Sequence, residues 1–425
     1  MWQVQVVPLG NGMKLYCHPG NTNLSGIGFA AGSIRDPKGK VGLAHYVEHV
    51  ITGRSERYPD ARELDLLMWK YMGGADNNRN IRTDRTSVFY GHGDLLRRKH
   101  MLTVFDMMAS FVHPKTRIVD PERLLIEAGA VHQEFYLRGK DFIESLLDDL
   151  FHRTMYTKNP IRHRVDCEVE DLKSITPQDV ERFLRRYYVP KNAFAIILGP
   201  KTEDAKAMAE RYFADWEGKS TPILDYDHTD DFPELSSVRS FELERAGIGQ
   251  YHFAIGFPTE GYTSADGAAL DVIKDILEYR LNLLLRDGNR DVDKGVYRTP
   301  TYTERSFVHG FIEATFATTS RSFEARAEDI VLGEFRRLTT ELVPHDELET
   351  MIEVSRNAYL DAFWNVPLSL SELIIYAATN EDTDLQGLHA YRGEILRINR
   401  RKIREVANKY FSKGKNYARV LIKPA

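Results

Sequence analysis

Two histidines and a glutamate lie close together in the stretch Gly-Leu-Ala-His45-Tyr-Val-Glu48-His49-Val. His45 and His49 are four positions apart, so on a helix they share one face. Two imidazoles one turn apart can bind a single metal ion, and zinc prefers nitrogen ligands in a tetrahedral arrangement. Glu48 lies on nearly the same face and can reach a water on the metal without binding the metal itself. This order of residues is the H-x-x-E-H arrangement of a metal-dependent hydrolase.

A catalytic zinc ion usually takes three protein ligands, so a third ligand is expected elsewhere in the chain. The segment from Asp120 to Phe135 offers carboxylates, and Asp120 followed by proline predicts a helix start there. Glu127 and Glu134 are seven positions apart, which places them two turns apart on one helix face. One carboxylate can bind the metal while the other supports a histidine ligand. Manganese or cobalt could occupy such a site, although two imidazoles and a carboxylate suit zinc best.

The elements around these residues occur twice along the chain. Residues 27–29 end a strand-like stretch and are followed by a helical run over 42–50. Residues 255–257 end a similar stretch, and a turn over 258–264 then leads into a helical run over 265–277. The pattern predicts an internal duplication, with repeats of a size typical of single domains.

The two repeats also end alike. An amphipathic helix over 180–188 precedes an apolar strand over 193–198, and a helix over 403–411 precedes a strand over 418–422. Strands mixed with helices of ten or more residues indicate an α+β or layered α/β class.

A polar stretch rich in aspartate and proline, residues 216–237, separates the two halves and predicts a linker. We therefore expect a metal-binding catalytic domain over 1–215 and a second copy over 238–425. In that copy the positions of His45, Glu48 and His49 correspond to about Leu270, Ile273 and Lys274, so it has lost the metal ligands and one zinc per chain is expected.

The composition is that of an ordinary globular protein, with 42% hydrophobic and 28% charged residues among 425. The net charge of −5 and the lack of a basic stripe argue against a nucleic-acid partner. The sequence contains neither a signal peptide nor an apolar run long enough for a membrane span. We expect a cytoplasmic protein in which Cys17 and Cys167 are reduced thiols.

Several of these motifs together resemble the pitrilysin or insulinase-type peptidases, family M16, which includes the mitochondrial processing peptidases. The resemblance covers nearly the whole chain and rests on Ala31-Gly32-Ser33, Gly42-Leu43-Ala44-His45, Gly73-Gly74, Tyr188-Val-Pro-Lys-Asn192 and the pairing of HxxEH with Glu-x6-Glu. It implies an α+β fold of two duplicated domains, each a mostly antiparallel sheet flanked by helices. It also implies zinc as the cofactor and a dimer of two related chains.

By the same resemblance, His45, His49 and Glu134 are the zinc ligands, Glu48 is the general base and Glu127 is the supporting carboxylate. The implied reaction is hydrolysis of peptide bonds in unfolded peptides through a zinc-bound water, with Glu48 taking the proton and passing it to the leaving amine.

Two further sets of residues are implied to hold the substrate. Asn78 and Arg79 correspond to an edge strand that binds peptide backbone, with Arg79 replacing the family's usual alanine. In the second half Tyr297 corresponds to a tyrosine that donates to the oxyanion. Its partner arginine is Arg290 by spacing or Arg286 by its place at a helix end.

Three functions follow from these assignments. The first is a self-sufficient zinc metalloendopeptidase. The second is the zinc-bearing subunit of a heterodimeric processing protease, whose partner chain supplies the Arg/Tyr pair. The third is a non-catalytic scaffold, which the intact metal-binding residues argue against. The substrate identity and the choice between homodimer and heterodimer are not determined by the sequence.

Overall fold

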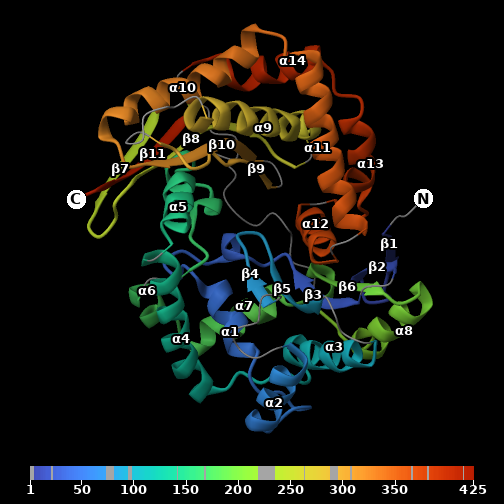
Figure 1. Ribbon diagram of the computed structural model, residues 1–425. Coiled ribbons are helices and arrows are strands. Elements are labelled where there is room, and N and C mark those ends of the chain that lie inside the picture. Colours follow the sequence, from blue (N-terminus) through green and yellow to red (C-terminus); the bar gives the residue numbers. More distant parts are fainter. Residues whose placement is uncertain are drawn as a thin grey trace. The chain divides into compact units, whose positions relative to one another are not determined.

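The computed structural model describes most of the chain and divides it into two compact units (Figure 1). Unit 1 contains Met1–Arg138, His163–Tyr226 and Asp361–Leu388, and unit 2 contains Gly139–Arg162, Asp227–Leu360 and His389–Ala425. The described residues are 4–20, 23–72, 81–93, 98–140, 142–166, 169–218, 235–262, 264–287, 295–306, 309–364, 367–380, 382–414 and 416–425.

Unit 1 is built on a six-stranded sheet in the order β1-β2-β6-β3-β5-β4. Its strands are β1 (Gln5–Pro8), β2 (Lys14–Pro19), β3 (Leu24–Phe29), β4 (Ile81–Thr83), β5 (Val88–Gly93) and β6 (Ala193–Gly199). Neighbouring strands are antiparallel except for β2 and β6, which are parallel. The strand β4 lies at one edge of this sheet, next to β5 alone.

Helices cover both faces of the unit 1 sheet, which explains why every residue of β3 is buried. In Figure 1, α1 and α3 lie on one side of β3 and α12 lies on the other. The helices of this unit are α1 (Leu43–Ile51), α2 (Ala61–Met72), α3 (Arg98–Val112), most of α4 (Pro121–Lys140), α6 (Val169–Ser174), α7 (Pro177–Tyr187), α8 (Thr202–Phe213) and α12 (Pro367–Thr379), with short turns η1 (Ser33–Arg35) and η4 (Pro190–Asn192).

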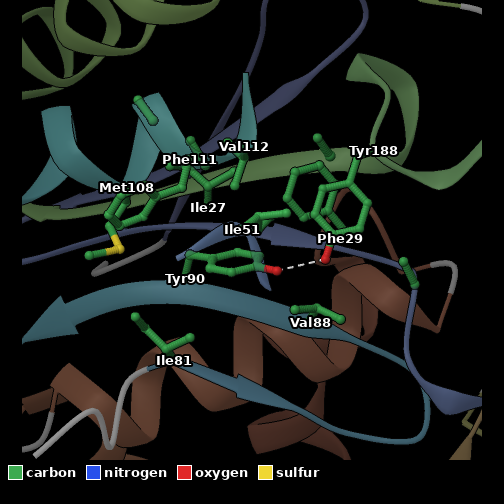
Figure 2. Close-up of a cluster of buried hydrophobic side chains, with 14 of the residues drawn as sticks. Ile27, Phe29, Ile51, Ile81, Val88, Tyr90, Met108, Phe111, Val112 and Tyr188 are labelled. Atoms are coloured by element: carbon green, nitrogen blue, oxygen red, sulfur yellow. Dashed lines mark hydrogen bonds between the residues drawn. The ribbon is translucent and has the colours of Figure 1, made fainter. Parts of the chain in front are cut away.

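The core of unit 1 contains a cluster of aromatic rings beside the sheet (Figure 2). Phe29 of β3 stacks on Tyr188, with ring centroids 4.1 Å apart. The hydroxyl of Tyr188 lies 2.7 Å from that of Tyr90 on β5, as the dashed line in Figure 2 shows. Buried hydroxyls need a partner, so this pair satisfies both groups inside an otherwise apolar core.

Unit 2 repeats the architecture with a five-stranded sheet in the order β7-β11-β8-β10-β9. Its strands are β7 (Arg239–Arg245), β8 (Tyr251–Glu260), β9 (Thr301–Ser306), β10 (His309–Thr318) and β11 (Ala418–Pro424). The helices lying wholly or mainly in this unit are α5 (Ile143–Met155), α9 (Gly267–Leu281), α10 (Arg321–Thr340), α11 (His345–Trp364), α13 (Gln386–Ile395) and α14 (Arg400–Phe411), with the 3-10 turn η3 (Pro160–Arg162) and a π-helical turn η5 (Asn282–Asp287).

The two sheets share one topology. The order β2-β6-β3-β5-β4 in unit 1 corresponds to β7-β11-β8-β10-β9 in unit 2, and each sheet contains one parallel pair, β2 with β6 and β7 with β11. The predicted α+β class with two mostly antiparallel sheets flanked by helices is therefore confirmed. The helix α1, which carries the HxxEH residues, follows β3 in unit 1, and α9 takes that place after β8 in unit 2.

One strand boundary differs from the sequence prediction. A turn was expected from Pro258, but β8 continues through Pro258 to Glu260. Proline cannot donate a backbone hydrogen bond, so it is tolerated where one edge of a strand has no neighbouring strand to pair with. The pairing of β8 with β11 ends at Gly256, and Pro258 pairs only with Phe311 of β10 in the described register.

Each unit takes one segment from the opposite half of the sequence. Helix α5, which precedes the linker in the chain, packs on β7, β8 and β11 of unit 2. Helix α12, near the C-terminus, packs on β3 and β6 of unit 1. The division into 1–215 and 238–425 stays a prediction, and most of the expected linker over 216–237 lies outside the described residues.

Candidate metal centre

The helix α1 carries the HxxEH residues and starts at a defined point. Gly42 precedes it in the left-handed region, with φ of 81°. The carboxylate of Asp36 accepts hydrogen bonds from the backbone N–H groups of Gly42 at 2.6 Å and Ala44 at 2.8 Å. These bonds satisfy N–H groups that have no partner within the helix, and they fix its first turn. His45, one residue further on, is thereby placed on a rigid element.

Three side-chain atoms of unit 1 converge at the predicted metal site. The Nε2 atoms of His45 and His49 are 3.2 Å apart. Oε2 of Glu134, from α4, lies 3.5 Å from Nε2 of His45 and 3.2 Å from Nε2 of His49. Two nitrogen ligands of a tetrahedral zinc ion would be ~3.3 Å apart at ordinary Zn–N distances. The group His45, His49 and Glu134 can therefore hold a metal ion of this kind.

Glu127 holds His49 from the other side of its ring. Oε2 of Glu127 is 3.0 Å from Nδ1 of His49, and Oε1 of the same carboxylate is 2.9 Å from the guanidinium of Arg123. A carboxylate on Nδ1 fixes the tautomer that leaves Nε2 directed at the metal position. Glu127 itself is only 7% exposed, so its charge is shielded little by solvent.

The surroundings of His49 favour the protonated, positively charged form of its imidazole. Burial lowers the pKa of this imidazole, but the hydrogen-bonded carboxylates of Glu127 and Glu134 outweigh that effect and raise its pKa to about 10. The Glu48 carboxylate adds in the same direction. A site that holds a proton this firmly without metal has a negative potential that would also attract a divalent cation.

Glu48 does not belong to the converging group. The residue is 7% exposed, and Oε2 of its carboxylate accepts a hydrogen bond of 2.8 Å from the hydroxyl of Thr83 on β4. Because β4 is the edge strand, this bond connects the carboxylate to the part of the sheet where an added strand could pair.

Two contacts fix α4 against α1 and the segment that follows it. The hydroxyl of Tyr46 donates to the backbone oxygen of Leu124, and the guanidinium of Arg54 pairs with Asp120 at the start of α4. Tyr46 is the residue after His45, so the contact lies beside the candidate metal group. These links hold Glu127 and Glu134 opposite the two histidines.

The predicted substrate residues lie partly beyond what the structure describes. Asn78, Arg79 and Arg290 fall outside the described residues. Tyr297 is described, 81% exposed, and the guanidinium of Arg286 from η5 lies 5.8 Å from the centre of its ring. The described part of the chain therefore brings Tyr297 together with Arg286 within unit 2.

The place in unit 2 that corresponds to α1 is mostly apolar. Leu270 and Ile273 of α9 are fully buried in the core, and Lys274 pairs with Asp275 at 2.7 Å. Elsewhere in unit 2, Asp148, His152 and Glu304 form a group with ligand atoms close together. Both ring nitrogens of His152 are already in contact there, Nδ1 with the Asp148 backbone oxygen at 3.0 Å and Nε2 with Glu304 at 3.1 Å.

Sequence patterns did not identify Asp36, Thr83 or Arg123. Asp36 precedes the helix start by several residues, so it lacks the spacing of an ordinary N-cap. Arg123 is four residues before Glu127 on α4, and an i,i+4 pairing could have indicated this contact.

Cys17 is a free, buried thiol, and Cys167 lies outside the described residues. No helix in the described part of the chain is both long and apolar enough to cross a membrane.

Comparison with known sequences gives two family matches. Residues 16–168 match the model for insulinase (peptidase family M16), and residues 174–354 match that for the peptidase M16 inactive domain. The zinc protease PqqE of Helicobacter pylori is 21% identical over 400 residues, covering 93% of this chain and 86% of that protein. The mitochondrial-processing peptidase subunit alpha of Rattus norvegicus is 24% identical over 214 residues, which is 50% of this chain and only 39% of that protein.

Solved structures show the same fold over the full length. A protease from Helicobacter pylori superimposes with a TM-score of 0.86 at 18% identity and covers 100% of both chains. A peptidase M16 inactive domain structure from Pseudomonas fluorescens gives 0.80 at 15% identity, covering 100% of this chain and 98% of that one. With both family models matched and the sheets of both units in place, the chain belongs to peptidase family M16.

Proposed function

We propose that this chain is a zinc metallopeptidase that hydrolyses peptide bonds in unfolded peptides. The observation that carries the proposal is the convergence of two imidazole Nε2 atoms and one carboxylate oxygen, 3.2–3.5 Å apart, from His45, His49 and Glu134. Two neutral nitrogens and one oxygen form a typical donor set for catalytic zinc. The similarity to a protein named zinc protease supports the choice of metal.

Different residues of the chain have different roles in the proposed peptide hydrolysis. When bound, zinc lowers the pKa of water toward ~7 and polarises a carbonyl group. Glu48 accepts the proton of the attacking water at its carboxylate and delivers it to the leaving amine. Thr83 holds Oε2 of Glu48, which leaves Oε1 to exchange that proton. Glu127 keeps the Nε2 atom of His49 directed at the metal position.

In this proposal the substrate binds along the edge strand β4. A peptide that pairs with β4 as an added strand would be read through its backbone, which suits unfolded chains of varied sequence. Thr83 belongs to this strand, so the same element would hold the peptide and orient Glu48. In this account Asn78 and Arg79 help to bind the peptide, and Tyr297, paired with Arg286 or Arg290, donates to the oxyanion.

A second candidate is the zinc-bearing subunit of a hetero-oligomeric peptidase. Several relatives are named as subunits of a mitochondrial-processing peptidase. Under this candidate a partner chain completes the site around the zinc ion of this chain.

Metal content and the activity of the lone chain test both candidates. Purified wild type is expected to contain one zinc ion per chain, and His49→Ala is expected to lose it. His132→Ala is the matched control, because this α4 histidine packs against Tyr136 instead of joining the metal group. Cleavage of a mixed peptide pool by the lone wild type supports the first candidate. Zinc binding without cleavage supports the second, and absence of zinc refutes both.

A further inference from the structure

The two ring nitrogens of His45 have different surroundings. Nε2 faces His49 and Glu134 at the metal position. Nδ1 is buried and makes no hydrogen bond among the described residues, and Oδ1 of Asp166 lies 3.5 Å from it. His45 as a whole is only 3% exposed, so solvent has little access to this nitrogen.

A buried N–H group without an acceptor is costly, and the usual partner of a metal-bound histidine is a carboxylate on its second nitrogen. His49 has such a partner in Glu127, at 3.0 Å. Asp166 occupies the corresponding position beside His45. A small displacement would bring its carboxylate within hydrogen-bonding distance of Nδ1. Each imidazole of the candidate metal group is therefore faced by its own carboxylate.

We propose that Asp166 is a positioning residue that orients His45 toward the metal by accepting a hydrogen bond from its Nδ1–H group. The proposal rests on the proposed function, because it assigns Asp166 to the same zinc site. It adds a residue outside the HxxEH and Glu-x6-Glu patterns. Asp166 faces His45, whereas Glu127 faces His49.

The segment that carries Asp166 is held against the metal-binding helices. Arg164 lies over the ring of Phe135, with its guanidinium 4.7 Å from the ring centre. Phe135 follows Glu134 directly on α4, so this contact places the segment beside a metal ligand. The side chain of Asp166 is only 14% exposed, which keeps its carboxylate in the interior, near His45.

The test measures zinc affinity by competition with a chelator, which does not depend on peptidase activity. Asp166→Leu removes the acceptor but keeps a similar volume, and Asp166→Asn keeps an acceptor oxygen without the charge. Loss of such a supporting contact lowers metal affinity by roughly 10–100-fold, so this loss is expected for Asp166→Leu. Asp166→Asn is expected to recover most of the affinity. Glu170→Gln is the matched control, because Glu170 is exposed and pairs with Lys173.

Different results separate this proposal from the proposed function. If wild type binds zinc and the zinc affinity of Asp166→Leu is within twofold of that of wild type, the positioning role is wrong while the zinc site stands. If wild type binds no zinc, the proposed function fails and this proposal fails with it. Should Asp166→Leu not fold, Asp166→Ala takes its place, and the same comparison with Asp166→Asn applies. An Asn variant as weak as the Ala variant would also contradict the hydrogen-bonding role.

A double variant gives an independent check. Because Asp166 and Glu127 face different histidines, the fold-losses of Asp166→Leu and Glu127→Gln are expected to multiply. A double variant no weaker than Glu127→Gln alone would show that Asp166 does not act on the metal site.

Discussion

Oε2 of Glu127 lies 3.0 Å from Nδ1 of His49, so this carboxylate, seven residues before Glu134, fixes the orientation of the His49 imidazole. Glu127→Gln keeps the size of the side chain but removes its charge and offers a weaker acceptor. We expect the affinity for zinc to fall by roughly 10–100-fold. Titration with a zinc chelator measures the loss.

The control for this change is Glu122→Gln, which alters an exposed glutamate in the first turn of the same helix. It is expected to bind zinc as wild type does. Equal affinities for Glu127→Gln and Glu122→Gln would show that Glu127 does not support the site.

The pKa of His49 predicts how stability depends on pH in the metal-free chain. Its folded pKa is raised from 6.5 to about 10, against the effect of burial, by Glu127 and Glu134. The interaction of protonated His49 with these carboxylates therefore stabilises the folded state. Its contribution is complete below pH 6.5 and is lost as the pH rises to about 10. The difference in thermal midpoint between metal-free wild type and His49→Gln should therefore shrink across this range.

Zinc should abolish this dependence, because a metal-bound imidazole is deprotonated at every pH in the window. A difference between metal-free wild type and His49→Gln that stays constant from pH 6.5 to 10 would contradict the assignment.

Thr83 provides a way to separate catalysis from metal binding. Thr83→Val removes the hydroxyl that donates to Glu48 but keeps a β-branched side chain on the edge strand. We expect kcat to fall by about 10–100-fold, since a hydrogen bond to a charged group contributes about 1.5–3 kcal/mol, while the zinc content stays unchanged. Steady-state kinetics on a fluorogenic peptide measure this. Thr83→Ser should restore most of the activity, and a Thr83→Val enzyme as fast as wild type would remove Thr83 from the mechanism.

The part of the site that could be predicted from sequence is the part that is local. His45, Glu48 and His49 share one helical turn, and Glu127 and Glu134 are two turns apart on another helix, so helical geometry alone places each set on one face. The structure brings His45, His49 and Glu134 together as this geometry allows.

The remaining contacts depend on tertiary packing. Thr83 reaches Glu48 from the edge strand, and Asp166 reaches His45 from an irregular segment, so no fixed spacing relates either residue to the motif. The same limit applies to the fold. The duplicated strands and helices are visible in the sequence, but nothing local indicates that α5 packs on the sheet of unit 2 or α12 on that of unit 1.

Tyr297 tests the oxyanion part of the proposal. Its ring is exposed and lies beside Arg286, so Tyr297→Phe removes a donor without disturbing the core. We expect kcat to fall about 100-fold, as for loss of one oxyanion donor, with unchanged zinc content. Tyr302→Phe on β9 is the matched control. A lone chain in which Tyr297→Phe keeps full kcat would show that this tyrosine does not serve the reaction.

The most direct test of the account compares wild type with Glu48→Gln on a mixed peptide pool, with zinc counted in both samples. Glutamine keeps the shape of the side chain but cannot accept the proton, so the account predicts one zinc per chain in both proteins. Cleavage products should form with wild type alone. Equal cleavage by the two zinc-loaded proteins would contradict Glu48 as the base, and a wild type without zinc would contradict the metal centre itself.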